Sequence, residues 1–380
     1  MTKKTKLYKK KIKNMYNYDL LWSLISLYVI GLIMVFSTSI NIGKNLYNNY
    51  FFFLERHFLY ICIALSLSLI FLRIPMIFWD YHSKKILILS IILLFIVSIL
   101  GNSVNGSSRW VNIGFINFQP SEISKISLFC YLSSYLKKNI KTINKTPWNF
   151  YKPIFILIIL SYLIISQPDL GTVIILLTTT LVLLFLAGFK LKNFILMIVL
   201  CIITIVPTII YTPYRIKRII SFIDPWKDPF GNGYQIIQSF IAFGRGHIFG
   251  VGLGNSIQKL EYLPESNTDF IYSIIAEELG YVGTLFVLSI IIKIAINAMY
   301  IGKIALKNQE IFSGFLAISI SIWLYVQTII NIGVVTGILP TKGLTLPLIS
   351  YGGSSLIITS IAIFWLLRID FENKIKNYFI

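Results

Sequence analysis

The chain has 380 residues, of which 56% are hydrophobic and only 13% are charged, and its mean hydropathy is +0.77. This composition excludes a soluble globular domain and predicts an all-α, polytopic membrane protein, because helices satisfy their own backbone groups within lipid. The formal net charge of +19 would suit a nucleic-acid-binding protein. The basic residues instead fall mainly at the ends of apolar runs on alternate sides, so we expect a membrane and no nucleic acid as partner.

The first half of the chain predicts a basic tail and six membrane helices. The lysine-rich residues 1–17 are cytoplasmic by the positive-inside rule. Helices are expected at 18–40, 56–72, 86–100, from 120 to about 136, at 153–166 and from 169 to about 188. Residues 101–118 are rich in Gly, Asn and Ser and predict an outer loop, whereas Arg73, Lys84 and Lys85 bracket an inner loop.

Two Gln-Pro pairs mark helix starts on the predicted outer face. Gln119-Pro120 opens one helix, where the missing proline N–H is harmless. Glu122 and Lys125 follow at i, i+3 and share a face, so they form either a structural pair between helices or part of a binding cavity. Asp169 follows the second pair and is most simply a first-turn acid that suits the helix dipole.

The second half predicts a large outer loop at residues 212–268 between the seventh helix, at 194–211, and the eighth. The glycine spacing at 243–255 faintly resembles a phosphate loop, but no strand precedes it and the Walker pattern is absent. A ninth helix is expected at 311–335, and prolines interrupt the outer segment 336–355. The tenth helix ends near residue 367, before a cytoplasmic tail at 368–380. About ten helices thus form one transmembrane domain, 18–367, with both ends cytoplasmic.

Asp269 stands where the polar segment ending at Thr268 meets an apolar helix that runs to about residue 298. Thr268 as N-cap and Asp269 at the positive end of the helix dipole would explain this placement without any function. Glu277 and Glu278 lie further along the same helix. Acidic groups in a membrane-length helix are costly and need a reason.

Five segments together carry a resemblance to a known family. They are GSSRW at 106–110, QPSEISK at 119–125, QPDLGT at 167–172, YLPESNTDFIYSIIAEELG at 262–280 and LPTKGLTLPLISYGGSS at 339–355. With these segments and its ten-helix layout, the chain resembles the SEDS family of peptidoglycan polymerases (shape, elongation, division and sporulation). The last segment is similar to the division-type branch rather than the elongation-type branch.

The resemblance implies an enzyme that polymerises lipid II into glycan strands at the outer side of the cytoplasmic membrane. Asp269 matches the catalytic acid of the family. Arg109, Trp110, Glu122 and Lys125 match its substrate-binding residues in the outer cavity. The reaction forms a β-1,4 bond and releases undecaprenyl pyrophosphate.

Two positions depart from the family pattern, Asn267 where histidine is common and Asn117 where a basic residue is common. Both departures weaken any assignment of headgroup contacts at these positions. They leave Asp269 untouched.

The chemistry fits these residues. The acceptor sugar hydroxyl needs a base within about 3 Å, and the donor already carries a good leaving group. Cations such as Arg109 and Lys125 would neutralise the departing pyrophosphate. The three cysteines and three histidines supply no metal-ligand spacing, so we expect no protein metal site, although a divalent cation (Mg²⁺ or Mn²⁺) is compatible with the chemistry.

The resemblance also implies a place and a partner. Because we find no transpeptidase domain in the sequence, crosslinking of the glycan strands needs a separate enzyme. We expect a class B penicillin-binding protein, together with other division proteins, as partner. The expected location is the cytoplasmic (inner) membrane at the division septum. Three alternatives stay open: a lipid II flippase, an elongation-type polymerase, and a structural scaffold. Polymerisation of lipid II in detergent separates the enzymes from the first, and tolerance of substitution at Asp269 identifies the last.

Overall fold

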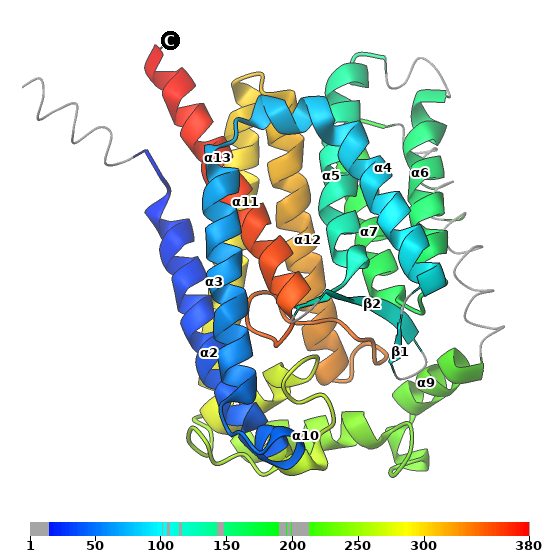
Figure 1. Cartoon of the computed structure of the whole chain (residues 1–380), viewed down its shortest axis with the longest axis vertical. Coiled ribbons are helices and arrows are strands. Elements are labelled where there is room, and N and C mark those ends of the chain that lie inside the picture. The colour runs from blue at the N-terminus through cyan, green and yellow to red at the C-terminus, as the bar shows by residue number, and fades with distance from the viewer. Residues whose placement is uncertain are drawn as a thin grey trace, which may run out of the picture.

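The computed structural model describes residues 15–100, 102–104, 107–113, 116–142, 148–189 and 213–379, together with positions 195 and 199. It is a bundle of long helices (Figure 1). Six described helices are long and apolar enough to cross a membrane, and two shorter apolar helices accompany them. The predicted all-α, polytopic membrane fold is therefore confirmed. The predicted seventh helix, 194–211, lies outside the described residues apart from positions 195 and 199.

The described helices of the bundle are α2 (Tyr18–Tyr47), α3 (Phe52–Arg73), α4 (Met76–Leu100), α5 (Pro120–Asn139), α6 (Trp148–Ile165), α7 (Leu170–Leu186), α11 (Ile271–Lys307), α12 (Ile311–Val335) and α13 (Gly353–Phe379). In the hydrophobic stretch of α12 and of α13, 78% of residues are buried within the protein, against 28% for α3 and α4. Consequently α12 forms the centre of the bundle, in contact with α5, α7, α11 and α13. The peripheral helices leave their apolar faces for lipid.

Several helices extend beyond their predicted ends. Lys84 and Lys85 lie within α4, so the predicted inner loop shrinks to residues 74–75. The last helix continues past residue 367 because ion pairs at i, i+4 support it, Arg368–Glu372 and Asp370–Lys374. Hydropathy marks where a helix leaves the apolar layer, which is not where its backbone hydrogen bonding ends.

The outer loop predicted at 101–118 contains a small antiparallel sheet instead. Strands β1 (Asn102–Val104), β2 (Ser107–Ile113) and β3 (Ile116–Phe118) pair in sequence order. Opposite partners include Val111 with Phe118 and Ile113 with Ile116. These β-branched and aromatic residues favour strands, and they outweighed the Gly, Asn and Ser content on which the loop prediction rested.

The segment predicted as a large outer loop, 212–268, is also partly helical from residue 213 onward. It contains α9 (Pro213–Ile223), α10 (Tyr234–Gly246) and two short turns, η1 (Pro225–Lys227) and η2 (Gln258–Tyr262). Figure 1 places α9 and α10 at the end of the bundle opposite the C-terminus. The hydroxyl of Ser239 on α10 donates to the carbonyl of Val335 at 2.6 Å, which ties this segment to the end of α12.

Helix α11 is broken at Gly280, where φ is +69°. The break frees backbone groups, and the glycine-rich run after α10 takes their place. The N–H groups of Val251 and Gly252 donate to the carbonyls of Glu277 and Glu278, both at 3.0 Å. In return, the amides of residues 281 and 282 donate to the carbonyls of residues 247 and 248. The glycine spacing that faintly resembled a phosphate loop therefore serves close backbone packing.

This packing makes Gly280 intolerant of a side chain. A Cβ there would lie 2.3 Å from the Gly250 nitrogen and 2.5 Å from the Ile248 carbonyl oxygen, in addition to the strain of positive φ. We expect Gly280→Ala to lower the free energy of unfolding by about 3 kcal/mol. Gly244→Ala is the matched control, because a Cβ at that helical position meets nothing within 4 Å. Thermal unfolding of both variants in detergent measures the difference, and equal midpoints would contradict the interpretation of the break.

Candidate functional site

The segment that carries Asp269 is clamped from two sides just before α11 begins. Asn331 on α12 donates its side-chain amide to the carbonyls of Asp269, at 2.9 Å, and of Leu344, at 2.7 Å. The hydroxyl of Ser350 donates to the carbonyl of Thr268 at 2.6 Å. The backbone at Asp269 is therefore fixed by α12 and by the interrupted segment 336–352.

Asp269 does not cap the helix. Helix α11 begins at Ile271, and its N-cap is Phe270, which makes no side-chain capping bond. The Thr268 hydroxyl bonds to the carbonyl and the carboxylate of Glu265 instead. Among the residues that the structure describes, none donates a hydrogen bond to the Asp269 carboxylate. Thr268 is therefore not the N-cap, and Asp269 lies near the positive end of α11 with a carboxylate whose lone pairs are unused by the described residues.

The surroundings of Asp269 raise its pKa from the usual aspartate value to about 7. Burial is the largest cause, and the nearby charge of Glu265 and then that of Asp169 add to it. Arg109 and Arg218 act in the opposite direction. A carboxyl group with a pKa near 7 is half ionised at neutral pH, which suits general-base chemistry.

Arg109, on strand β2, lies near this carboxylate. Its guanidinium donates to the carbonyl of Gln167 at 2.8 Å and to that of Pro168. A Cβ on Gly343 would lie 3.2 Å from Asp269 Oδ2 and 3.8 Å from Arg109 Nη1, so both charged groups border the same small residue. The structure thus brings two of the predicted site residues together. Trp110 is the next residue of the strand, and neighbouring residues on a strand point to opposite faces.

Asp169 is the N-cap of α7 rather than a first-turn residue. Its carboxylate accepts from the Thr172 amide at 3.2 Å and from the Thr172 hydroxyl at 2.8 Å. The Ser121 hydroxyl at 3.1 Å and the Gln119 amide at 3.4 Å also donate to it. Asp169 therefore joins the start of α7 to the start of α5, and the two Gln-Pro helix starts meet at one buried carboxylate.

Glu122 and Lys125 form the predicted ion pair, and it is buried. The Lys125 ammonium lies 2.9 Å from the Glu122 carboxylate, donates to Gln327 Oε1 at 3.2 Å and stands 5.0 Å from the centre of the Trp323 ring. The Lys125 side chain has no exposed surface. These partners belong to α5 and α12, which is the arrangement expected of a structural pair between helices.

Glu277 and Glu278 receive a structural explanation that the sequence alone did not provide. Glu277 accepts from Arg245 at 2.9 Å and from the Ile257 amide at 3.0 Å. Glu278 pairs with Lys259 at 2.7 Å. Both acids are fully buried, and together they fix the glycine-rich run and the following turn to the break in α11.

Arg218 is the site residue that sequence reasoning missed. It lies on α9, donates to the carbonyl of Thr341 at 3.0 Å and lowers the pKa of Asp269. The available signal was the basic cluster at 215–218 within the outer segment.

In the described part of the chain, no group of three or more His, Cys, Asp or Glu residues is arranged to hold a metal ion.

The buried Glu122–Lys125 pair leads to a stability prediction. Lys125→Met should lower the free energy of unfolding by about 3 kcal/mol, because it leaves the Glu122 charge buried without a partner. Glu122→Gln combined with Lys125→Met should recover most of that loss, since no buried charge remains. Thermal unfolding of the single and double variants measures this coupling. A double variant no more stable than the single one would contradict the pairing.

Comparison with known proteins gives a consistent family. The family model described as Cell cycle protein, which groups FtsW, RodA and SpoVE, matches residues 18–375. A protein of Buchnera aphidicola (from Acyrthosiphon pisum) named "Probable peptidoglycan glycosyltransferase FtsW" is 56% identical over 97% of this chain and 95% of its own. An Escherichia coli O6:H1 protein with the same name is 52% identical over 96% of this chain and 88% of its own.

Solved structures show the same fold. One, described as "Structural coordination of polymerization and crosslinking by a peptidoglycan synthase complex", superposes with a TM-score of 0.75 at 25% identity, covering 94% of this chain and 98% of that chain. The Thermus thermophilus rod shape determining protein RodA superposes with a TM-score of 0.68 at 21% identity. That alignment covers 93% of this chain and 96% of RodA and concerns the fold alone.

Proposed function

The chain belongs to the family of cell cycle proteins that contains FtsW, RodA and SpoVE, and from this premise we propose that it polymerises lipid II into glycan strands during septal cell-wall synthesis. The predicted family is confirmed, and the chain is a multi-pass membrane enzyme of the peptidoglycan glycosyltransferase class. The names of the relatives favour the division-type branch over the elongation-type alternative.

The observation that supports a catalytic role best is the state of Asp269. Asp269 is half-buried, and its carboxylate accepts no hydrogen bond from the described residues and has a pKa of about 7. We assign Asp269 the role of general base, which removes the proton from the acceptor hydroxyl as that oxygen attacks C1 of the donor sugar. The β-1,4 C–O bond forms while the bond from C1 to the pyrophosphate oxygen breaks, and its electron pair leaves with undecaprenyl pyrophosphate.

The other predicted site residues have different roles in this proposal. Arg109, joined by Arg218, stabilises the negative charge that develops on the leaving pyrophosphate. Trp110 follows Arg109 on β2 and points to the other face of the strand, so its role in substrate binding stays a prediction. Glu122 and Lys125 act by keeping α5 and α12 in register beneath the site, because their mutual pairing leaves no exposed ammonium surface for a ligand.

The catalytic test is Asp269→Asn, which keeps the size of the side chain but removes its charge and basicity. We expect a loss of polymerisation rate of a hundredfold or more, because no base then accepts the proton. The wild-type rate should rise with pH through about 7, as Asp269 loses its proton. The rate of glycan synthesis from lipid II in detergent, measured between pH 5.5 and 8.5, checks both expectations.

Thermal stability of the same samples provides the control. Between the unfolded pKa of about 4 and the folded pKa, the native protein binds the Asp269 proton more tightly, so this group destabilises the fold as the pH rises. Asp269→Asn should therefore be at least as stable as the wild type at pH 8. A stable Asn variant with the wild-type rate would show that Asp269 is not the base. No polymer from the wild type, with or without a transpeptidase, would favour the flippase alternative.

We further propose a class B penicillin-binding protein as partner in the inner membrane at the division septum. The neighbouring structure described as a peptidoglycan synthase complex that coordinates polymerisation and crosslinking supports this assignment. Co-purification from native membranes tests it, and repeated absence of such a transpeptidase would contradict it.

The proposed orientation places the termini in the cytoplasm and α10 outside. Single cysteines at Phe249, which is 80% exposed, and at Lys307, at the end of α11, probe the two sides. The outer cysteine is placed at Phe249 and not at the adjacent Gly250, because a Cβ at Gly250 would lie 2.1 Å from the Glu278 carbonyl oxygen. An impermeant maleimide should label only position 249 in intact cells from which the outer membrane has been removed. Labelling of both positions, or of position 307 alone, would overturn the orientation.

A further inference from the structure

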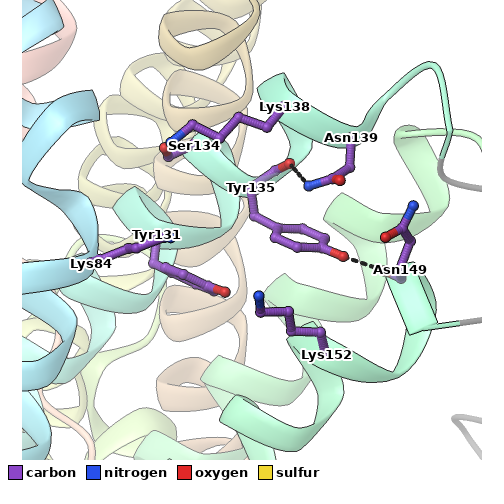
Figure 2. Close-up of a pocket in the computed structure, with 8 residues that line it drawn as sticks. All are labelled: Lys84, Tyr131, Ser134, Tyr135, Lys138, Asn139, Asn149 and Lys152. Atoms are coloured by element: carbon purple, nitrogen blue, oxygen red, sulfur yellow. Dashed lines mark hydrogen bonds between the residues drawn. The ribbon is translucent and has the colours of Figure 1, made fainter.

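A pocket of about 140 Å³ opens between α4, α5 and α6, far from Asp269 (Figure 2). Its walls come from the last turns of α5, the first turns of α6 and one turn of α4. In Figure 1 these parts lie at the end of the bundle that also carries the C-terminus, opposite α9 and α10. Nothing in the proposed glycosyltransferase reaction uses this end of the molecule.

Three lysines surround the pocket, and no carboxylate lines it. Lys84, Lys138 and Lys152 make no hydrogen bond or ion pair with any part of the chain that the structure describes. Asp80 lies one turn before Lys84 on α4, but its carboxylate is already paired with Lys137 at 2.6 Å. The pocket therefore concentrates positive charge that the protein itself does not neutralise, which selects an anion.

The polar floor of the pocket is preformed. The Tyr135 hydroxyl donates to the Asn149 carbonyl at 2.8 Å, which fixes the end of α5 against the start of α6. Tyr131 is only 4% exposed, and its hydroxyl makes no hydrogen bond within the described residues. Figure 2 shows this hydroxyl and the Lys152 ammonium pointing toward each other across the pocket. The Tyr131 hydroxyl borders the pocket, so it can donate to a ligand oxygen that also contacts the Lys152 ammonium.

The residues around the pocket indicate which class of anion would bind there. On α4, Ile88 follows Lys84 by one turn and is 57% exposed, and on α6 Phe155 follows Lys152 and is 65% exposed. In a membrane protein, exposed apolar residues of this kind face acyl chains, and lysines at the adjacent helix ends face the headgroups. If the phosphate group of a phospholipid lies in this pocket, its acyl chains can run along the exposed apolar residues of α4 and α6.

We propose that this pocket, named here the Lys84/Lys138/Lys152 pocket, binds the phosphate group of an anionic phospholipid. Three ammonium groups and the Tyr131 hydroxyl supply the donors, and the volume accommodates a tetrahedral anion. This pocket is separate from the proposed site of polymerisation, so phospholipid binding there should not depend on whether lipid II is bound.

The test uses the full chain in a neutral detergent. Phosphatidylglycerol, phosphatidylcholine and sodium phosphate are titrated separately, and binding is followed by native mass spectrometry and by the shift of the thermal midpoint. We expect phosphatidylglycerol to bind and stabilise the protein at concentrations at least tenfold below those of phosphatidylcholine. Sodium phosphate at millimolar concentration should not displace it. Full displacement, with the same stabilisation by phosphate alone, would overturn the lipid as source and assign the pocket to a soluble phosphate.

Matched variants show whether this pocket is responsible. The triple substitution Lys84→Gln, Lys138→Gln and Lys152→Gln should weaken phosphatidylglycerol binding about a hundredfold, because each lysine contributes about fivefold. Tyr131→Phe, which removes only the hydroxyl, should weaken it severalfold. The control triple removes the same charge from exposed lysines outside the pocket, Lys85→Gln, Lys303→Gln and Lys307→Gln, and should bind within about twofold of the wild type.

Folding does not confound the comparison, because all three pocket lysines are exposed and unpaired within the described residues. Lipid-free thermal midpoints and the polymerisation rate should match the wild type in both triple variants. Equal loss of binding in the pocket triple and the control triple would overturn the proposal, since it would indicate attraction by net charge alone. Undiminished binding in the pocket triple would overturn it as well.

Discussion

The break in α11 constrains the structure more than any other feature. Within a membrane protein each backbone group needs a partner, and interrupting a helix at Gly280 leaves several without one. The run from residue 247 to 252 supplies them through backbone hydrogen bonds in both directions. Two buried acids, Glu277 and Glu278, then hold the flanking segments by ion pairs with Arg245 and Lys259. The outer segment is therefore part of the folded bundle and cannot detach without exposing unpaired groups.

The same arrangement determines where the Asp269 carboxylate, the proposed base, lies. Asp269 precedes α11 by two residues, and its carbonyl is bonded to Asn331 on α12, the central helix of the bundle. The break, the start of α11 and α12 thus form one rigid frame. A carboxylate on such a frame is positioned without hydrogen bonds to its own oxygens, so its basicity is not reduced by donors from the protein.

Much of this was accessible from the sequence, and the exceptions have physical reasons. Hydropathy and helix-start signals depend on neighbouring residues, so the spans and the prominence of Asp269 were predictable. The direction in which the Glu122–Lys125 pair faces was not, because it depends on Trp323 and Gln327, about two hundred residues away. Arg218 was missed because only the position of α9 relates it to Asp269. The sheet formed by β1 to β3 was missed because the Gly, Asn and Ser content of 101–118 predicted a loop, although β-branched and aromatic residues between them favour strands.

The way Arg109 is held has a consequence for how the enzyme attracts its substrate. Its guanidinium is oriented by the carbonyl oxygens of Gln167 and Pro168, and it forms no salt bridge with a carboxylate in the described part of the chain. Carbonyl oxygens are neutral acceptors, so they hold the guanidinium in one orientation without neutralising its positive charge. In the proposed reaction this positive charge faces the incoming diphosphate, so capture of the donor should weaken as ionic strength rises, in the manner of an electrostatically steered encounter.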